Sequence, residues 1–178
     1  MKKILETKRV YLREMTQDDY DQLCEILQDE DVMYAYEHAF CDEEVQTWLT
    51  NQLKRYDQYG FGLWAIIDKQ TDAFVGQAGL TMQRIENTEK LEIGYLLKKK
   101  YWHQGYATEA AIACRDYAFN ELNYDYVTSI IRVNNFASQA VAKRVGMKKV
   151  KQIVKHYYNM DMVHDVYMIT KDRPILLE

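Results

Sequence analysis

Proline, glycine and cysteine are scarce in this sequence. Its 178 residues include one proline, seven glycines and three cysteines. A collagen-like or linker-rich chain needs far more proline and glycine and is therefore excluded. The cysteines, Cys24, Cys41 and Cys114, are odd in number and widely spaced, which argues against a disulfide framework. We expect reduced thiols and a cytoplasmic protein.

Long apolar runs and an excess of positive charge are also missing. The longest apolar runs, such as residues 63–67, have five residues, too few to span a membrane. Glu6 and Lys8 interrupt the start of the chain, where a secretory signal needs an apolar segment. With 23 Lys and Arg against 27 Asp and Glu, the formal net charge is −4. A protein that binds a phosphate backbone carries a basic excess, so we expect neither nucleic acid nor membrane as a partner.

The residues that are present are typical of a globular domain. Hydrophobic residues make up 48% and charged residues 28% of the chain, which excludes disorder. The length suits one domain, and no repeat or linker divides the chain. We therefore predict a single domain over residues 1–178.

Hydrophobic periodicity predicts seven strands and four helices. The strands are expected at residues 8–15, 61–67, 74–82, 91–97, 126–133, 147–157 and 162–170. The helices are expected after a Thr16–Asp19 capping box, after a cap at Asp42, from Ala107 to Leu122, and over residues 137–145, where Gly146 ends the last one. Three successive strands lack crossover helices, which argues against a fully parallel sheet. The predicted fold class is α/β (α+β) with a mixed sheet.

A glycine directly before a predicted helix marks a candidate anion site. Gly105 lies between the strand at 91–97 and the helix that begins near Ala107. The first turn of a helix offers unpaired backbone N–H groups and the positive end of the helix dipole. Gly105 leaves room for a diphosphate and Thr108 adds a hydroxyl donor. A glycine that merely eases the turn explains this short pattern equally well, so further motifs are needed.

Several other sites are excluded or weak. The loop has no Gly-x-x-x-x-Gly-Lys-Ser/Thr and no Gly-x-Gly-x-x-Gly pattern, so neither a nucleoside triphosphatase loop nor a dinucleotide fold is predicted. His38-x-x-Cys41 has no second pair at metal-ligand spacing, and we predict no metal site.

Three segments together resemble the GNAT superfamily of N-acetyltransferases, most closely its RimJ/RimL-like branch, whose members acetylate ribosomal-protein N-termini among other amines. The resemblance covers residues 7–171. The matching segments are Thr7-x-Arg9-Val10-x-Leu12-Arg13 with Asp18-Asp19, the loop His103-Gln104-Gly105-Tyr106-Ala107-Thr108, and Asn135-Phe136-Ala137-Ser138 with Lys143-x-x-Gly146-Met147. They occur in the family's order and on the expected elements.

The resemblance implies a fold and a cosubstrate. The expected GNAT fold is a mixed, mostly antiparallel sheet of about seven strands flanked by four helices, splayed between its two middle parallel strands. Acetyl-CoA would bind there, with a bulge near residues 95–97 freeing backbone groups for the pantetheine amides and the thioester carbonyl. The implied cofactor-binding residues are Tyr95, Leu96, Leu97, His103, Gln104, Gly105, Tyr106, Ala107, Thr108, Asn135 and Ser138. Asn135 also suits a helix N-cap, and both roles are compatible.

The catalytic residues follow less directly from the resemblance. Glu92 is the candidate general base, since it lies on the strand that should hold the thioester; a structural ion pair is the alternative. Where many members have a tyrosine general acid this chain has Ala142, so either another group donates the proton or the thiolate leaves with help from water alone. Tyr95 is the candidate donor, and Tyr106 and Tyr167 are further tyrosines that suit donors or pocket walls. Trp102 replaces the Gln or Arg usual before the loop. Since the loop binds through its backbone, this change is tolerable.

The expected activity is transfer of an acetyl group from acetyl-CoA to a primary amine by direct attack in a ternary complex. The acceptor stays open between a protein N-terminus and a small amine such as a polyamine, amino acid or aminoglycoside. The acidic segment at residues 29–31 suits a polycation, or is simply solvated. A non-catalytic CoA-binding domain is a further alternative, and both a monomer and a homodimer are compatible with the sequence.

Overall fold

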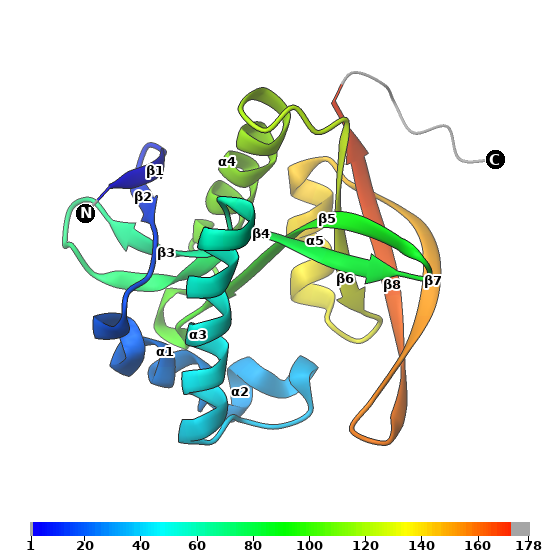
Figure 1. Ribbon diagram of the computed structural model, residues 1–178, viewed down its shortest axis with the longest axis horizontal. Coiled ribbons are helices and arrows are strands. Elements are labelled where there is room, and N and C mark those ends of the chain that lie inside the picture. Colours follow the sequence, from blue (N-terminus) through cyan, green and yellow to red (C-terminus); the bar gives the residue numbers. More distant parts are fainter. Residues whose placement is uncertain (1, 172–178) are drawn as a thin grey trace.

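Eight strands form a single sheet in the computed structural model, which describes residues 2–171 (Figure 1). The strands are β1 (Lys3–Glu6), β2 (Val10–Arg13), β3 (Leu63–Asp68), β4 (Phe74–Ile85), β5 (Thr88–Leu97), β6 (Tyr126–Arg132), β7 (Lys148–Tyr157) and β8 (Met160–Thr170). Their order is β1-β2-β3-β4-β5-β6-β8-β7. Within the described residues, β5 and β6 are the one parallel pair of neighbours. The predicted mixed, mostly antiparallel sheet is confirmed.

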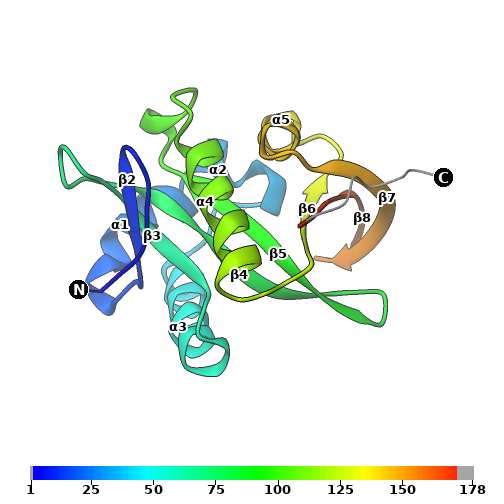
Figure 2. The same cartoon turned by 90° about the horizontal axis from the view of Figure 1, so that it is seen from above.

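Helices cover both faces of this sheet (Figure 2). They are α1 (Tyr20–Leu27), α2 (Glu30–Met33), α3 (Asp42–Tyr59), α4 (Tyr106–Asn120) and α5 (Phe136–Val145). One apolar core joins the sheet to α4 and α5, where alanines such as Ala110 and Ala111 let α4 lie close to the strands. A second core joins the other face to α1 and α3 through Leu23, Val45 and Leu49. The sheet therefore separates two helical layers.

Local sequence signals place most helix ends. The Asp19 carboxylate accepts the N–H of Thr16 at 2.8 Å and holds Arg13 through two contacts of 2.8 Å, so the predicted box does fix the entry to α1. At α3 the N-cap is Cys41 rather than the predicted Asp42, because Glu44 accepts the Cys41 N–H at 2.9 Å. Gly146, at φ +97°, ends α5 as predicted.

One strand and one α-helix were not predicted. β1 is a four-residue edge strand that pairs only with β2, and such a short segment carries too little alternation to be recognised. The single turn α2 is likewise too short for a helical period. The hairpin of β4 and β5 is also longer than predicted, because the strands pair up to Ile85 and Thr88 and the turn comprises only Glu86 and Asn87.

The sheet parts between β5 and β6. Their registered pairing is confined to Glu92 opposite Thr128, and two hydroxyl groups extend the contact: Thr128 donates to the Leu91 carbonyl and Ser129 to the Ile93 carbonyl, both at 2.9 Å. The expected bulge near residues 95–97 is wrong, because β4 and β5 pair without a register shift from Gly76–Leu97 to Ile85–Thr88. Divergence of β6, rather than a bulge, opens the predicted splay.

Neither a membrane span nor a metal cluster is found within residues 2–171. No helix there is long and apolar enough to cross a membrane. No three His, Cys, Asp or Glu side chains of this range gather as ligands for a metal ion.

Candidate active site

The start of α4 presents a set of backbone donors. Gly105 is the N-cap at φ +81°, and His103 before it also has a positive φ of 59°. The first bond of the helix runs from the Glu109 N–H to the Gly105 carbonyl at 3.0 Å. The N–H groups of Tyr106, Ala107 and Thr108 precede it and have no intrahelical acceptor. These donors lie where the sequence predicts an anion site.

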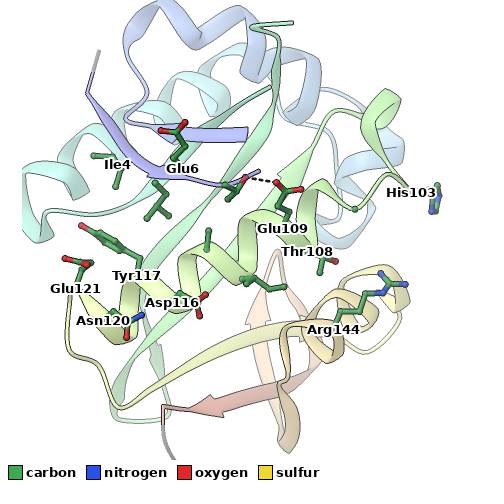
Figure 3. A pocket seen from close by; sticks show the side chains of 15 residues that line it. Ile4, Glu6, His103, Thr108, Glu109, Asp116, Tyr117, Asn120, Glu121 and Arg144 are labelled. Atoms are coloured by element: carbon green, nitrogen blue, oxygen red, sulfur yellow. Dashed lines mark hydrogen bonds between the residues drawn. The ribbon is translucent and has the colours of Figure 1, made fainter. Parts of the chain in front are cut away.

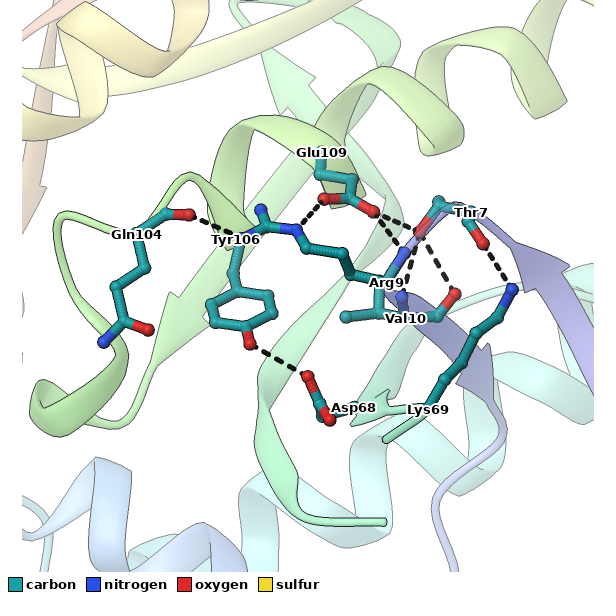
Figure 4. Close-up of polar contacts among 8 residues, drawn as sticks. All are labelled: Thr7, Arg9, Val10, Asp68, Lys69, Gln104, Tyr106 and Glu109. Atoms are coloured by element: carbon teal, nitrogen blue, oxygen red, sulfur yellow. Dashed lines mark hydrogen bonds and ion pairs between the residues drawn. The ribbon is translucent and has the colours of Figure 1, made fainter. Parts of the chain in front are cut away.

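Two residues near β2 hold this helix start in place (Figure 4). The Glu109 carboxylate, in the first turn of α4, accepts the Thr7 hydroxyl at 2.6 Å, the Arg9 N–H at 2.9 Å and the Arg9 Nε at 2.7 Å. Burial favours the neutral form of Glu109, but these hydrogen bonds outweigh it and lower its pKa. Glu109 is therefore an ionised anchor between the loop and the sheet.

The Arg9 guanidinium also supports the loop directly. Its Nη1 donates to the Gln104 carbonyl at 2.9 Å, and the group lies over the Tyr106 ring at 4.4 Å from the centroid. The Tyr106 hydroxyl donates to Asp68 at 2.9 Å, which ties the same loop to the end of β3 (Figure 4). Arg9 belongs to one of the sequence motifs, but the motif alone predicted no role for Arg9 or Glu109.

An open cavity of about 1070 Å³ adjoins the helix start. His103, Gly105 and Thr108 line one end, and Figure 3 shows Arg144 of α5 across from Thr108. Residues of α4 and β1 form most of the remaining wall, and several of them are carboxylates. An anionic ligand group thus belongs at the Gly105 end, beside the backbone donors and a cation.

The gap between β5 and β6 exposes backbone groups of β5. In an antiparallel pair, alternate residues bond to the partner strand, and the Lys98 N–H donates to the Val75 carbonyl of β4. The backbone of Leu96 therefore faces β4, whereas that of Tyr95 and Leu97 faces the gap. The predicted backbone role of Leu96 is wrong; its side chain lines a cavity instead.

Trp102 forms a hydrogen bond with one of these exposed backbone groups. Its indole Nε1 donates to the Leu97 carbonyl at 3.2 Å. The replacement seen in the sequence is therefore structural: the indole closes the end of β5 and leaves the N–H groups of Tyr95 and Leu97 and the Tyr95 carbonyl toward the gap.

A second cavity, of about 540 Å³, lies at the gap and shares no lining residue with the first. Glu92, Tyr95, Asn135 and Ser138 all line it, so the structure brings these predicted residues together. Burial raises the pKa of Glu92 to about 7, against the opposing charges of Lys155 and Arg55 and a hydrogen bond from the Ile130 backbone. A carboxyl group that titrates near neutrality beside a cavity is suited to general base catalysis.

The polar groups of Tyr95 and Asn135 already have partners. The Tyr95 hydroxyl donates to the Ser138 carbonyl at 3.0 Å, and burial raises its pKa. The Asn135 Oδ1 caps α5 by accepting the Ser138 N–H at 3.1 Å and also accepts the Tyr34 hydroxyl at 2.7 Å. The N-cap role of Asn135 is confirmed, and its amide N–H groups face no partner within the described residues.

The segment from Tyr34 to His38 bridges the parted halves of the sheet. Besides the Tyr34–Asn135 bond, Glu37 forms an ion pair with Arg132 of β6, and the His38 ring lies 5.0 Å from that of Tyr158. These contacts between distant parts of the chain leave no local sequence signal.

The remaining candidates lie elsewhere. Ala142 is buried in the core and has no titratable group. The Tyr167 hydroxyl donates to Gln139 at 3.3 Å and its ring belongs to the core, so packing describes it better than proton donation.

Comparison with known proteins gives a consistent picture. A family model described as an acetyltransferase (GNAT) domain matches residues 9–148. The uncharacterized protein YkkB of Bacillus subtilis (strain 168) is 39% identical over 152 residues, which cover 85% of this chain and 88% of YkkB. An acetyltransferase from Agrobacterium tumefaciens str. C58 superposes with a TM-score of 0.79 at 25% identity and covers 94% of both chains.

A further solved structure bears on the RimJ/RimL-like branch. RimL, described as a ribosomal L7/L12 alpha-N-protein acetyltransferase in complex with coenzyme A, has a TM-score of 0.76 at 18% identity, covering 96% of this chain and 99% of that one. At this identity the likeness shows the fold alone.

Proposed function

Since the chain belongs to the GNAT family of acetyltransferases, we propose that it transfers the acetyl group of acetyl-CoA to a primary amine, on a protein N-terminus or a small molecule, within a ternary complex. The observation that carries this proposal is the meeting of Glu92 and the exposed Tyr95 backbone at the gap between β5 and β6. The carboxyl group of Glu92 lines the cavity at this gap, and the backbone donors of α4 open into the other cavity.

The residues present fit the two ends of acetyl-CoA. The N–H groups at the start of α4, from His103 to Thr108, would hold the diphosphate, with Arg144 as a nearby cation. The N–H groups of Tyr95 and Leu97 would pair with the pantetheine arm and polarise the thioester carbonyl. The unpartnered amide of Asn135, with Ser138 beside it, would bind the same arm from α5.

The chemical step then needs one proton acceptor and one donor. The amine nitrogen attacks the thioester carbon, a C–N bond forms, the C–S bond breaks, and the thiolate leaves. Glu92, acting through a water, takes the proton that the amine loses. The thiolate takes a proton from water. Tyr95 is the alternative donor, but its raised pKa and its bond to Ser138 both weaken it as an acid.

A base that titrates near pH 7 suits an α-amino group. The pKa of such a group is about 7.7–8.0, whereas that of a lysine side chain is about 10.4. A substantial fraction of the former is therefore unprotonated at neutral pH. This match supports an α-amine acceptor over a lysine side chain.

The finer assignments rest on the sequence motifs. The Thr7-x-Arg9 and Asn135-x-x-Ser138 segments support the RimJ/RimL-like branch and a single domain over residues 1–178. The three free cysteines support a cytoplasmic setting. A non-catalytic CoA-binding domain is the second candidate, favoured by Ala142 in place of a tyrosine.

Replacement of Glu92 by glutamine tests the proposal. We expect Glu92→Gln to lower turnover by about 10²–10⁴-fold, measured as thiol release with a panel of amines, because the amide cannot take a proton. Acetyl-CoA affinity, measured by calorimetry, should stay unchanged. Glu89→Gln, an exposed residue of the same strand, is the matched control. Unchanged turnover at pH 7 removes Glu92 from the role of base, and cofactor binding without thiol release for any amine supports the binding domain.

A further inference from the structure

The second cavity carries a charge opposite to that of the whole protein. The chain has a formal net charge of −4, yet the cavity is lined by Arg55, Arg132 and Lys155 and, among acidic residues, by Glu92 alone. An excess of cations in this one place, in an acidic protein, calls for a local explanation.

Only one of these three cations is neutralised by an acidic side chain. Arg132 forms an ion pair with Glu37. Arg55 donates to the Gln52 amide oxygen at 3.1 Å, and Gln52 is itself 1% exposed and fixed by the Leu63 N–H. Neither Arg55 nor Lys155 has a carboxylate within 4 Å in the described part of the chain.

These cations converge on the site from two elements. Arg55 comes from α3 and Lys155 from β7, and both are close enough to Glu92 to lower its pKa against the effect of burial. His164 of β8 responds to the same field: burial lowers its pKa, and the charges of Lys155 and Arg132 lower it further. The space next to Glu92 is therefore electropositive.

The phosphates of the cofactor do not account for Arg55 and Lys155. The anion site at the start of α4 opens into the first cavity, and Arg55 and Lys155 line the second one. The second cavity adjoins the thioester end of the arm at Tyr95 and Asn135, and its space beside Glu92 would take the acceptor.

We propose that the acceptor carries a carboxylate close to its reacting amine, and that Arg55 and Lys155 bind this carboxylate while Glu92 faces the amine. Amino acids and peptides with an acidic residue near the N-terminus have this chemistry. Polyamines and aminoglycosides have no such carboxylate. In addition, the positive charges of Arg55 and Lys155 would oppose their entry. The inference rests on the proposed acetyl transfer and narrows its acceptor.

Matched acceptors test the proposal directly. Thiol release is measured with acetyl-CoA and two pairs: phenylalanine against phenylalaninamide, and a free-N-terminus tetrapeptide amide with Asp against Asn at its second position. Spermidine serves as the polycation. Rates are compared per concentration of unprotonated amine, because a carboxylate also raises the pKa of a neighbouring amine. The wild type should favour the carboxylate of at least one pair by about tenfold or more in kcat/KM.

Charge-removing variants identify the residues. At a pH well above the pKa of Glu92, Arg55→Gln and Lys155→Gln should each reduce kcat/KM by about tenfold more for the carboxylate-bearing member than for the neutral member. The controls are Lys54→Gln on α3 and Lys148→Gln on β7, both exposed and outside the cavity. As a second readout, the loss of either cation should move the rise of kcat/KM to higher pH, since both lower the pKa of Glu92.

The outcomes separate this inference from the proposed function. Equal kcat/KM within both pairs, or a preference for spermidine, overturns the carboxylate site while acetyl transfer stands. If the variants slow both members of a pair equally, the cations serve Glu92 alone and the inference is wrong. Cofactor binding without thiol release for any acceptor overturns the proposed function, and this inference with it.

Discussion

The carboxyl group of Glu92 titrates near neutral pH because the cavity wall buries it. The unfolded chain ionises this group near pH 4.5, whereas the folded chain does so near pH 7. The unfolded state thus binds fewer protons between these values, and raising the pH through this interval weakens the folded state. The burial that suits Glu92 to accept a proton at pH 7 therefore lowers the free energy of unfolding at that pH.

We predict that Glu92→Gln changes stability in a pH-dependent manner. Relative to the wild type, the variant should gain up to about 3 kcal/mol in free energy of unfolding between pH 4.5 and pH 8, because it has no carboxyl group to ionise. Urea unfolding of both proteins at several pH values measures this difference. A difference independent of pH would show that Glu92 titrates normally in the folded chain.

The Tyr95 side chain provides a second prediction at this scale. Tyr95→Phe removes the bond to the Ser138 carbonyl and should lower the free energy of unfolding by about 1 kcal/mol. Turnover should stay close to that of the wild type, because the backbone N–H of residue 95 remains. Tyr167→Phe, which loses a bond to Gln139, is the control. A large loss of turnover in Tyr95→Phe alone would instead identify the phenol as the proton donor.

Among single residues, the sequence predicted those whose chemistry is local. Gly105 was recognisable because a glycine directly before a helical period leaves room for a ligand at the first turn, and the structure shows it as the N-cap of α4. The contacts of Trp102 with Leu97 and of Ser129 with Ile93 could not be recognised from the sequence. Each joins elements whose relative position depends on the folded sheet, so spacing along the chain gives no sign of it.

At the scale of elements, the anion site depends on how α4 is fastened to β2. Arg9 neutralises Glu109, a carboxylate one turn from the donors that would face the diphosphate. Without Arg9 this negative charge stands unpaired beside an anionic ligand. Thr7 and Arg9 thus position the start of α4 through Glu109, and any effect on a bound cofactor would be indirect.

We therefore predict that Arg9→Ala weakens acetyl-CoA binding by about tenfold, through repulsion by Glu109 and a looser loop. The double variant Arg9→Ala/Glu109→Gln should recover part of this loss, since the unpaired charge is gone. Calorimetric titration with acetyl-CoA measures both, and Arg84→Ala, an exposed arginine of β4, is the control. No recovery in the double variant would assign the whole effect to loop geometry.

Elements with a clear period were predicted well and short ones were not. The small-residue face of α4, the alternation of β2 and the apolar run of β3 gave the right type and nearly the right bounds. The one-turn α2 and the edge strand β1 depend on what they pack against. The bulge was expected from family resemblance alone, and the continuous register of β4 and β5 shows that the opening arises from β6.

At the scale of the whole molecule, the sheet consists of two parts joined at the β5–β6 gap. The join comprises one registered pair and the hydroxyl contacts of Thr128 and Ser129, with the Tyr34–His38 segment bridging the opening. A cofactor that pairs with β5 on one side and with Asn135 on the other would connect the two parts. The sequence predicted this division through the family, since no local pattern marks where two strands diverge.

Acetyl-CoA should accordingly stabilise the whole molecule and protect specific backbone groups. At 100 times its Kd, a ligand of the folded state adds about 2.7 kcal/mol to the free energy of unfolding, which a rise in Tm reports. Amide hydrogen exchange should slow at Tyr95 and Leu97 and at Tyr106, Ala107 and Thr108, whose N–H groups lack acceptors in the free protein. Glu92→Gln should show the same protection, because that substitution leaves the donors intact. Protection confined to other segments, with the ligand demonstrably bound, would mean that the cofactor does not occupy the β5–β6 gap.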